Sequence, residues 1–221
     1  MKVVIYQVLV RLFGNTCTHN VPYGTKEENG IGKFSDFTDA ALEGIKELGT
    51  THIWLTGVLH HALVGDYTHI GIPNDIPYLV KGRAGSPYAI KDYYNVNPDL
   101  ADDPTKRLEE FIALVERIHQ HGLKVMIDIV PNHVARCYSI SNPKGVEGFG
   151  VQDNIQVGYA RDNNFYYNIG ELLTLPASSI DYIPEEPALR ELLLTPYKEY
   201  PAKWTGNSRS SNPALTDWYE T

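Results

Sequence analysis

The sequence predicts an α/β protein built from parallel β/α units, because three apolar runs alternate with amphipathic helical patterns. Residues 3–10, 52–59 and 123–130 are rich in Val, Ile and Leu, a pattern typical of strands buried on both faces. The order strand, helix, strand, helix, strand is typical of right-handed parallel β/α units. Three such strands can open either a doubly wound sheet or a (β/α)8 barrel.

Two helices connect these strands. We expect the first to end at Gly49, and the second to begin at an Asp103 N-cap followed by Pro104 and to end at Gly122. The side chains predicted to face the core are Phe37, Ala41, Leu42, Ile45 and Leu48 in the first helix and Leu108, Phe111, Ile112, Val115 and Ile118 in the second.

The remaining segments are loop-rich. A connection of about forty residues follows the second strand, and unstructured loops of that length are uncommon unless they are functional. His60 and His61, at its start, are interpreted as loop histidines. Residues 134–187 show no sustained period and are predicted to form a small irregular subdomain inserted after the third strand. Residues 187–194 predict a short helix that starts with proline, and residues 205–213 predict a loop.

Composition limits the function classes. The 221 residues carry a formal net charge of −8, which argues against a nucleic-acid partner and leaves a neutral ligand open. No apolar stretch is long enough to span a membrane, so no membrane partner is expected. Cys17 and Cys137 are predicted to be free thiols. The apolar start is too polar for a signal peptide; we expect a cytoplasmic protein, or a secreted or periplasmic one if a signal was removed.

The residues with chemical potential lie at the end of the third strand. Asp128 stands inside an apolar run, and a buried carboxylate requires a partner. Asn132 and His133 follow at the carboxyl end of the strand, where parallel β/α folds bind ligands. Together the three can orient a polyhydroxylated ligand or hold a cation, whereas each alone can equally serve to bond backbone groups at a loop entry.

This segment resembles a known family. Residues 128–133 read Asp-Ile-Val-Pro-Asn-His, which is similar to the first conserved region of the α-amylase superfamily (glycoside hydrolase family 13). Residues 88–94 (Tyr-Ala-Ile-Lys-Asp-Tyr-Tyr), followed by Asn97-Pro98, resemble the family's Tyr-x-x-x-Asp-Tyr segment after strand two, and residues 5–8 resemble its first strand. One departure is that the family has Gly directly before the tyrosine, whereas here Gly85 precedes Tyr88 by three positions.

The resemblance implies a fold and a set of roles. Residues 1–133 would form the first three or so β/α units of a (β/α)8 TIM barrel, 134–187 the family's inserted domain B, and 188–221 a return towards the barrel, cut before strand four or five. Tyr88 would stack on the sugar ring at the cleaved bond and His133 would bond its hydroxyls. Asp92 and Asp128 would support the site, and Asn132 would offer its side-chain oxygen to a structural calcium ion, with Asp153, Asp162 or Asp181 as further candidate ligands.

The resemblance also predicts the reaction of the parent protein. The family consists of retaining enzymes with an Asp nucleophile and a Glu acid/base, and neither is found within this chain, so both are expected beyond Thr221. The predicted function is an α-amylase-type glycosidase acting on α-glucans such as starch, glycogen or maltooligosaccharides, with the chain alone inactive.

Two alternatives remain open at this point. One is a non-catalytic amylase-like module that binds carbohydrate or protein; the other is an unrelated β/α enzyme that binds metal or phosphate at Asp128, Asn132 and His133. A barrel cut before closure would expose strand edges, so we expect the isolated chain to self-associate.

Overall fold

The computed structural model describes residues 2–141, 145–173 and 182–204, and it divides the chain into two compact units. Unit 1 comprises residues 1–60 and 95–129, and unit 2 comprises residues 61–94 and 130–221. The sequence-based division at residues 133 and 187 separates barrel, insertion and return, whereas the two units are compact groups of contacting residues. The sequence-based division therefore stays a prediction. Among the described residues, no helix is long and apolar enough to cross a membrane.

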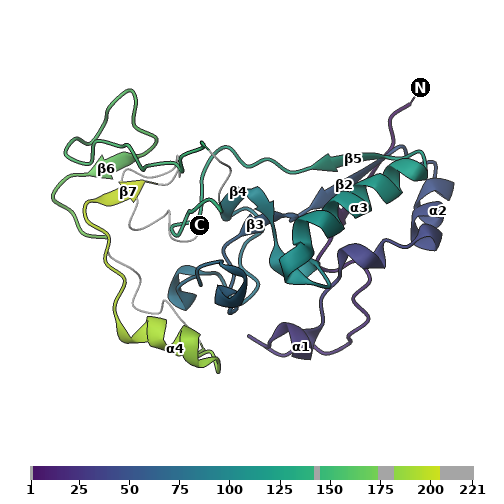
Figure 1. Cartoon of the computed structure of the whole chain (residues 1–221), viewed down its shortest axis with the longest axis horizontal. Coiled ribbons are helices and arrows are strands. Elements are labelled where there is room, and N and C mark those ends of the chain that lie inside the picture. The colour runs from purple at the N-terminus through teal and green to yellow at the C-terminus, as the bar shows by residue number, and fades with distance from the viewer. Residues whose placement is uncertain (1, 142–144, 174–181, 205–221) are drawn as a thin grey trace. The chain divides into compact units, whose positions relative to one another are not determined.

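Unit 1 contains the predicted parallel sheet. The strands β1 (Ile5–Leu9), β2 (His52–Thr56) and β5 (Lys124–Ile127) are ordered β1-β2-β5, with Ile5 opposite His52 and His52 opposite Lys124. Figure 1 shows these strands with α2 (Asp39–Glu47) and α3 (Arg107–Gln120) beside them. The predicted parallel strands are therefore confirmed, and the chain is a mixed α/β protein. Closure of these units into a barrel stays a prediction.

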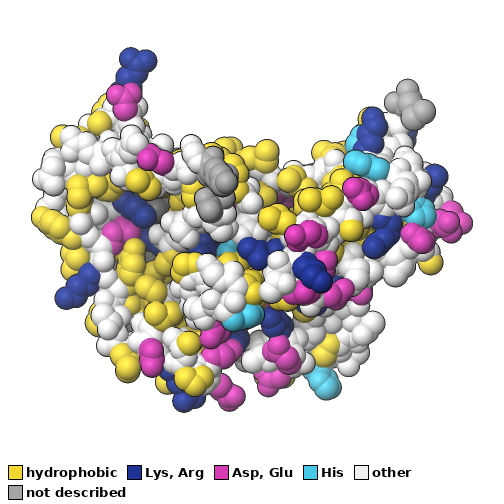
Figure 2. All heavy atoms as spheres, in the orientation of Figure 1, with side chains coloured by type: hydrophobic (Ala, Val, Ile, Leu, Met, Phe, Trp, Pro, Cys, Tyr) yellow, Lys and Arg dark blue, Asp and Glu magenta, His cyan; other side chains and the backbone are white. Residues whose placement is uncertain are grey.

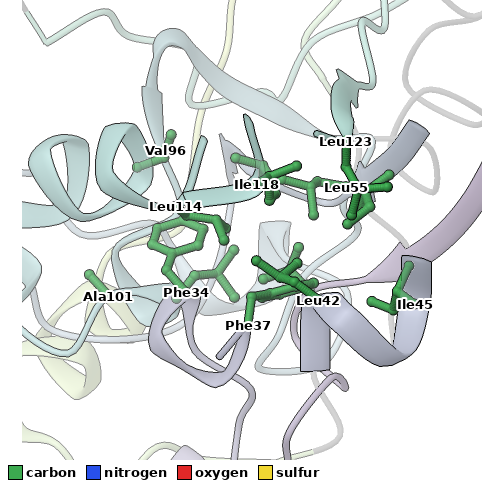
Figure 3. Packing of buried hydrophobic residues seen from close by; sticks show 14 residues of the cluster. Phe34, Phe37, Leu42, Ile45, Leu55, Val96, Ala101, Leu114, Ile118 and Leu123 are labelled. Carbon is green, nitrogen blue, oxygen red and sulfur yellow. The ribbon is translucent and has the colours of Figure 1, made fainter. Parts of the chain in front are cut away.

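The core of unit 1 lies between the sheet and its helices (Figure 3). Phe37, Leu42, Leu55 and Ile118 are fully buried in it, and Leu114 is 1% exposed. α2 is capped by the Thr38 side chain, which accepts a hydrogen bond from the amide of Ala41. Gly49, which follows this helix, has a φ of +80°, so the predicted helix end is confirmed by a left-handed residue.

The predicted burial of two strands was wrong. Ile5 in β1 is 46% exposed, and in the third strand Met126, Ile127 and Ile129 are 38%, 40% and 74% exposed. Both strands stand at the edges of the described three-stranded sheet, whereas the central strand β2 has a neighbour on each side. An apolar run thus identified each strand correctly but could not tell an edge strand from a central one.

The stripe predicted for α3 was also shifted. Leu108 and Ile112 are 41% and 56% exposed, while Leu114, absent from the predicted stripe, is buried beside Ile118. In α2, Leu48 at the helix end is 69% exposed. The buried face of α3 is rotated by about one residue from the predicted one. The pattern could not distinguish the two faces, because apolar residues lie on more than one side of α3.

The second predicted strand ends earlier than expected. Gly57 has a φ of +76° and separates β2 from β3 (Leu59–His61), which pairs with β4 (Ile90–Val96). The boundary between the units passes through both of these strands. His60 and His61 are 2% and 3% exposed, so their interpretation as loop histidines was wrong: they are part of a strand. The long connection is likewise not a plain loop, because it contains β3 and β4.

Unit 2 is dominated by loops and short elements. It contains α4 (Pro187–Leu194), as predicted, and an antiparallel pair of short strands, β6 (Tyr166–Asn168) and β7 (Ala202–Trp204), which the sequence did not indicate. A four-residue helix, α1 (Lys26–Asn29), belongs to unit 1. Cys17 and Cys137 are both free thiols, which confirms that prediction. The predicted loop at 205–213 lies outside the described residues.

Candidate functional site

Asp92 fastens the segment that follows His133 to strand β4. Its side chain is buried and accepts hydrogen bonds from the amide of Tyr94 through Oδ1 (2.9 Å) and from the amide of Ser141 through Oδ2 (2.7 Å). The Ser141 hydroxyl also donates to Oδ2. Backbone bonds from Ala135 to Ile90 (2.8 Å) and from Ser139 to Lys91 (3.0 Å) join the same two segments. Asp92 therefore acts as a structural support within unit 2.

Tyr93, the next residue of β4, holds the segment that carries Asn132 and His133. Its hydroxyl donates to the carbonyl of Val130 and lies 3.4 Å from the carbonyl oxygen of His133. Burial raises the pKa of the Tyr93 phenol, so at neutral pH it stays protonated and able to donate. Its ring packs near Tyr138 and Phe149, with 6.2 Å between centroids in each case. The Asp92-Tyr93 pair thus anchors the chain both before and after His133.

Asn132 and His133 lie together on this anchored segment. The Asn132 side chain is exposed and His133 is half-buried. The Asn132 Nδ2 amide lies 3.3 Å from Nδ1 of His133 and can donate to it when that nitrogen is unprotonated. A ring oriented through Nδ1 can use Nε2 as the hydrogen-bonding atom towards a ligand.

Tyr88 lies on the turn that leads into β4. It is 45% exposed, and its amide donates to the Ser86 hydroxyl at 3.3 Å. Gly85 in this turn has a φ of +68°, and a Cβ there would come 1.8 Å from the carbonyl oxygen of Ala62. Residue 85, three positions before Tyr88, therefore has to be glycine, because the backbone there is left-handed and lies too close to the backbone of Ala62 for a side chain.

Asp128 belongs to unit 1. It follows β5, and its Oδ1 accepts a hydrogen bond from the indole nitrogen of Trp54 on the neighbouring strand β2. The expected partner of this carboxylate is thus an indole N–H rather than a cation. Its other oxygen is buried with no hydrogen-bond partner among the described residues.

The described residues do not assemble a carboxylate-rich calcium site at Asn132. Calcium takes six to eight oxygen ligands, and in residues 2–141, 145–173 and 182–204 no group of three or more His, Cys, Asp or Glu gathers to hold a metal. Asp153 is engaged by the amides of Asn164 and Phe165, at 2.7 and 2.9 Å. Asp181 lies outside the described residues. A calcium ion at Asn132 stays a prediction that rests on the family resemblance alone.

Buried polar groups that were not predicted from the sequence hold unit 2 together. Lys91 and Asp75, 2% exposed each, form an ion pair of 2.9 Å, and Lys91 also donates to the carbonyl of Pro73. Arg136 is paired with Glu199 at 2.7 Å. A charged residue within an apolar stretch, such as Lys91 after Ile90, was the available signal, since a buried charge requires a partner.

The chain belongs to the α-amylase family, because residues 7–148 match the family model described as "Alpha amylase, catalytic domain". It is 27% identical over 177 residues to a cyclomaltodextrin glucanotransferase of Geobacillus stearothermophilus, with 75% of this chain and 22% of that protein covered. It is 28% identical over 148 residues to a pullulanase of Bacillus subtilis, covering 60% and 19% of the two chains. The chain thus spans about a fifth of the length of these relatives.

A solved structure with a similar sequence is the α-amylase of Geobacillus thermoleovorans complexed with acarbose. It is 30% identical, covers 61% of this chain and 24% of its own, and superposes with a TM-score of 0.40. The sequence match to the family, rather than this superposition, carries the assignment.

Proposed function

We propose that this chain is the N-terminal part of the catalytic barrel, with domain B, of an enzyme that acts on α-glucans as a hydrolase or transglycosylase. The family match over residues 7–148 supports the class of enzyme. The relatives include a glucanotransferase and a pullulanase, so both transfer and hydrolysis occur among the proteins it resembles.

The observation that carries the proposed site is the double attachment made by Asp92 and Tyr93. These adjacent residues fix the segments on either side of His133 to one strand, through the bonds to Val130 and Ser141. Tyr88 lies two residues before that strand, in the same compact unit. A sugar site needs its contacts held in place before the ligand arrives, and this arrangement supplies such preorganisation.

In this proposal Tyr88 offers a face for stacking against the apolar side of a pyranose ring, and its exposure makes that face accessible. His133 hydrogen-bonds hydroxyl groups of the same sugar, with its ring oriented by Asn132. Asp92 and Asp128 act on the substrate only through the segments they hold. These two acids are positioning residues.

The bond-breaking groups of the complete enzyme are proposed to lie beyond Thr221. An Asp carboxylate attacks the anomeric carbon while a Glu about 5 Å away protonates the departing glycosidic oxygen, giving a glycosyl-enzyme. The same Glu, now ionised, removes a proton from water or from an acceptor sugar hydroxyl. The oxygen of that group attacks the anomeric carbon and displaces the Asp carboxylate. Without these two acids the 221-residue chain is expected to bind glucan but not to cleave it.

The test is binding of maltoheptaose to the 221-residue chain by isothermal titration calorimetry. Tyr88→Ala and His133→Ala are expected to weaken binding about fivefold or more, as the loss of a stacking contact or a hydrogen bond predicts. The matched controls are Tyr94→Ala, a tyrosine that is 50% exposed, and His19→Ala, an exposed histidine. Equal affinities in all four variants would contradict the proposed site.

A second measurement addresses the reaction. Release of reducing sugar from starch by the purified chain, above a buffer control, would show that the chain contains its own catalytic acids. A coding sequence that continues past Thr221 without an Asp and a Glu at the ends of the next strands would instead favour the non-catalytic module.

A further inference from the structure

A strip of three aromatic side chains lies on the surface of unit 2 and includes none of the residues assigned above. Tyr159 and Tyr166 stack at 5.5 Å between ring centroids, and Trp204 follows at 5.8 Å from Tyr166. Tyr159 and Tyr166 are 65% and 53% exposed, and Trp204 is half-buried. In Figure 2, side chains of the hydrophobic class, which includes tyrosine, reach the surface on the side of the molecule that carries β6 and β7.

The strip is built by the alternation of side chains in a short antiparallel sheet. Tyr166 on β6 is directly opposite Trp204 on β7, so both side chains project from the same face. The neighbours of Tyr166 along the strand, Phe165 and Tyr167, are buried at 7% and 8% exposure on the opposite face. The aromatic residue at 166 is therefore not needed to fill the small core, which its two neighbours already fill.

The loop that presents Tyr159 is held in place by an internal carboxylate. Asp153 accepts hydrogen bonds from the amides of Asn164 and Phe165 and from the hydroxyl of Tyr167, the last at 3.0 Å. The amide of Tyr167 donates to the carbonyl of Gly158 at 3.0 Å, which brings the next residue, Tyr159, beside β6. The exposed rings are thus fixed before any ligand binds, and fixed aromatic side chains lose little conformational entropy on binding.

The chemistry of the strip fits a neutral, hydroxyl-rich chain. The exposed aromatic rings offer apolar surface to sugar rings, and the phenol hydroxyls of the two tyrosines add hydrogen-bonding edges, whereas the indole nitrogen of Trp204 is buried. Asn154 and Gln156, in the same loop, are exposed amides that can bond sugar hydroxyls. A polyanion is a poor match for a chain of net charge −8.

We propose that Tyr159, Tyr166 and Trp204 form an accessory α-glucan-binding strip, separate from the site of Tyr88 and His133. The identity of the ligand rests on the proposed function, since α-glucan is the substrate class of that site. The strip would hold a second stretch of a long glucan chain, so its effect is larger on a polysaccharide than on a short oligosaccharide.

The test compares retardation of the 221-residue chain in native gels containing amylopectin with binding of maltotriose, a ligand too short to join distant contacts. Tyr159→Ala/Tyr166→Ala is expected to weaken amylopectin retardation about tenfold or more, since two stacking contacts are lost. Tyr159→Phe/Tyr166→Phe keeps both rings and is expected to stay within about twofold of the original chain. Tyr94→Ala is the matched control, and far-UV circular dichroism verifies folding of each variant.

The outcomes separate this inference from the proposed function. Loss of amylopectin binding in the strip variant, with Tyr88→Ala still retarded, supports the strip whether or not the first site binds sugar. Unchanged retardation in the strip variant, or no retardation of the original chain, overturns the inference. A change of oligomeric mass in light scattering, without any change in glucan binding, would overturn it in favour of contact between copies of the chain.

Discussion

The two units of this chain are stabilised by different means. Unit 1 packs an apolar cluster around Leu55, Leu114 and Ile118 between a parallel sheet and its helices. In the described part of unit 2 the apolar clusters are small, and polar side chains bond the loops, such as Asp92, Asp153 and the Lys91–Asp75 pair. An apolar core tolerates substitutions that conserve its volume, whereas a buried charge that loses its partner lowers the free energy of unfolding strongly. The proposed ligand contacts all belong to the unit whose loops are fixed by polar bonds.

The largest expected effect comes from the buried ion pair of unit 2. Lys91→Met leaves the Asp75 carboxylate without its cation and is expected to lower the free energy of unfolding by about 3–5 kcal/mol, measured by urea denaturation. Burial already raises the pKa of Asp75, so the uncompensated group is expected to take up a proton in this variant. The exposed Lys81→Met is the control, and the double variant Lys91→Met/Asp75→Leu should recover most of the loss. A loss below about 1 kcal/mol in Lys91→Met would remove the contrast between the units.

A smaller but comparable effect is expected in the apolar core of unit 1. Leu114→Ala creates a cavity beside Ile118 and should cost about 2–5 kcal/mol in urea denaturation. Ile112→Ala, on the exposed side of the same helix, serves as the matched control and should cost much less. Equal losses would indicate that Ile112, like Leu114, contributes to the core, and would contradict the exposed position of Ile112.

The Asp153 carboxylate allows a local test of loop attachment. Asp153→Asn weakens the bonds to Asn164, Phe165 and Tyr167, and should reduce local stability by about 1–3 kcal/mol. Faster hydrogen exchange at the amides of Asn164 and Phe165 would report it. Asp162→Asn, an exposed acid in the same loop, should leave these amides unchanged. Faster exchange in both variants would mean that net charge, rather than the Asp153 bonds, holds the loop.

The smallest effect is a pH dependence at Cys137. Burial raises the pKa of this thiol from 9.0 to about 11, so the folded chain favours the neutral thiol. The unfolded chain releases this proton first as pH rises, and the stabilisation present below about pH 9 is lost as pH approaches 11. Between about pH 8 and pH 10 the loss should be about 1 kcal/mol.

Cys137→Ala should remove that slope from urea denaturation curves, whereas Cys17→Ala should leave it in place. The thiolate is the reactive form, so Cys137 in the folded chain should also react slowly with thiol reagents near pH 8. A slope unchanged in Cys137→Ala would assign the alkaline loss to other groups.

Sequence patterns identified most of the helices and strands in which apolar residues recur at regular spacing. They misjudged how deeply the faces of these elements are buried. The helices at α2, α3 and α4 and the three parallel strands were predicted, because apolar residues recur at the spacing of the element. The exposed faces of β1 and β5 were not, since burial depends on which neighbours a strand acquires. β4 was missed because its four aromatic or apolar residues are mixed with Lys91, Asp92 and Asn95 in no regular alternation.

The same limit applies to the candidate site. Asn132 and His133 were first chosen from their place at the end of the third strand, and Tyr88 and Asp92 from the family resemblance. The structure adds how Asp92 and Tyr93 hold the segments around them. Tyr93 itself was not singled out as an anchor, because one tyrosine among fifteen carries no signal until its hydroxyl is seen on the carbonyl of Val130. The assignments of individual sugar contacts stay predictions.

From the sequence alone one could infer the family, the parallel β/α order of unit 1 and the need of Asp128 for a partner. These follow from short-range periodicity and from the cost of burying a charge, both of which are local properties of the chain. The folded chain was needed to show that Trp54 is that partner, that Lys91 pairs with Asp75, and that Tyr166 and Trp204 share one face of a sheet. Each of these pairs joins residues distant in sequence, and its formation depends on the packing of the segments between them.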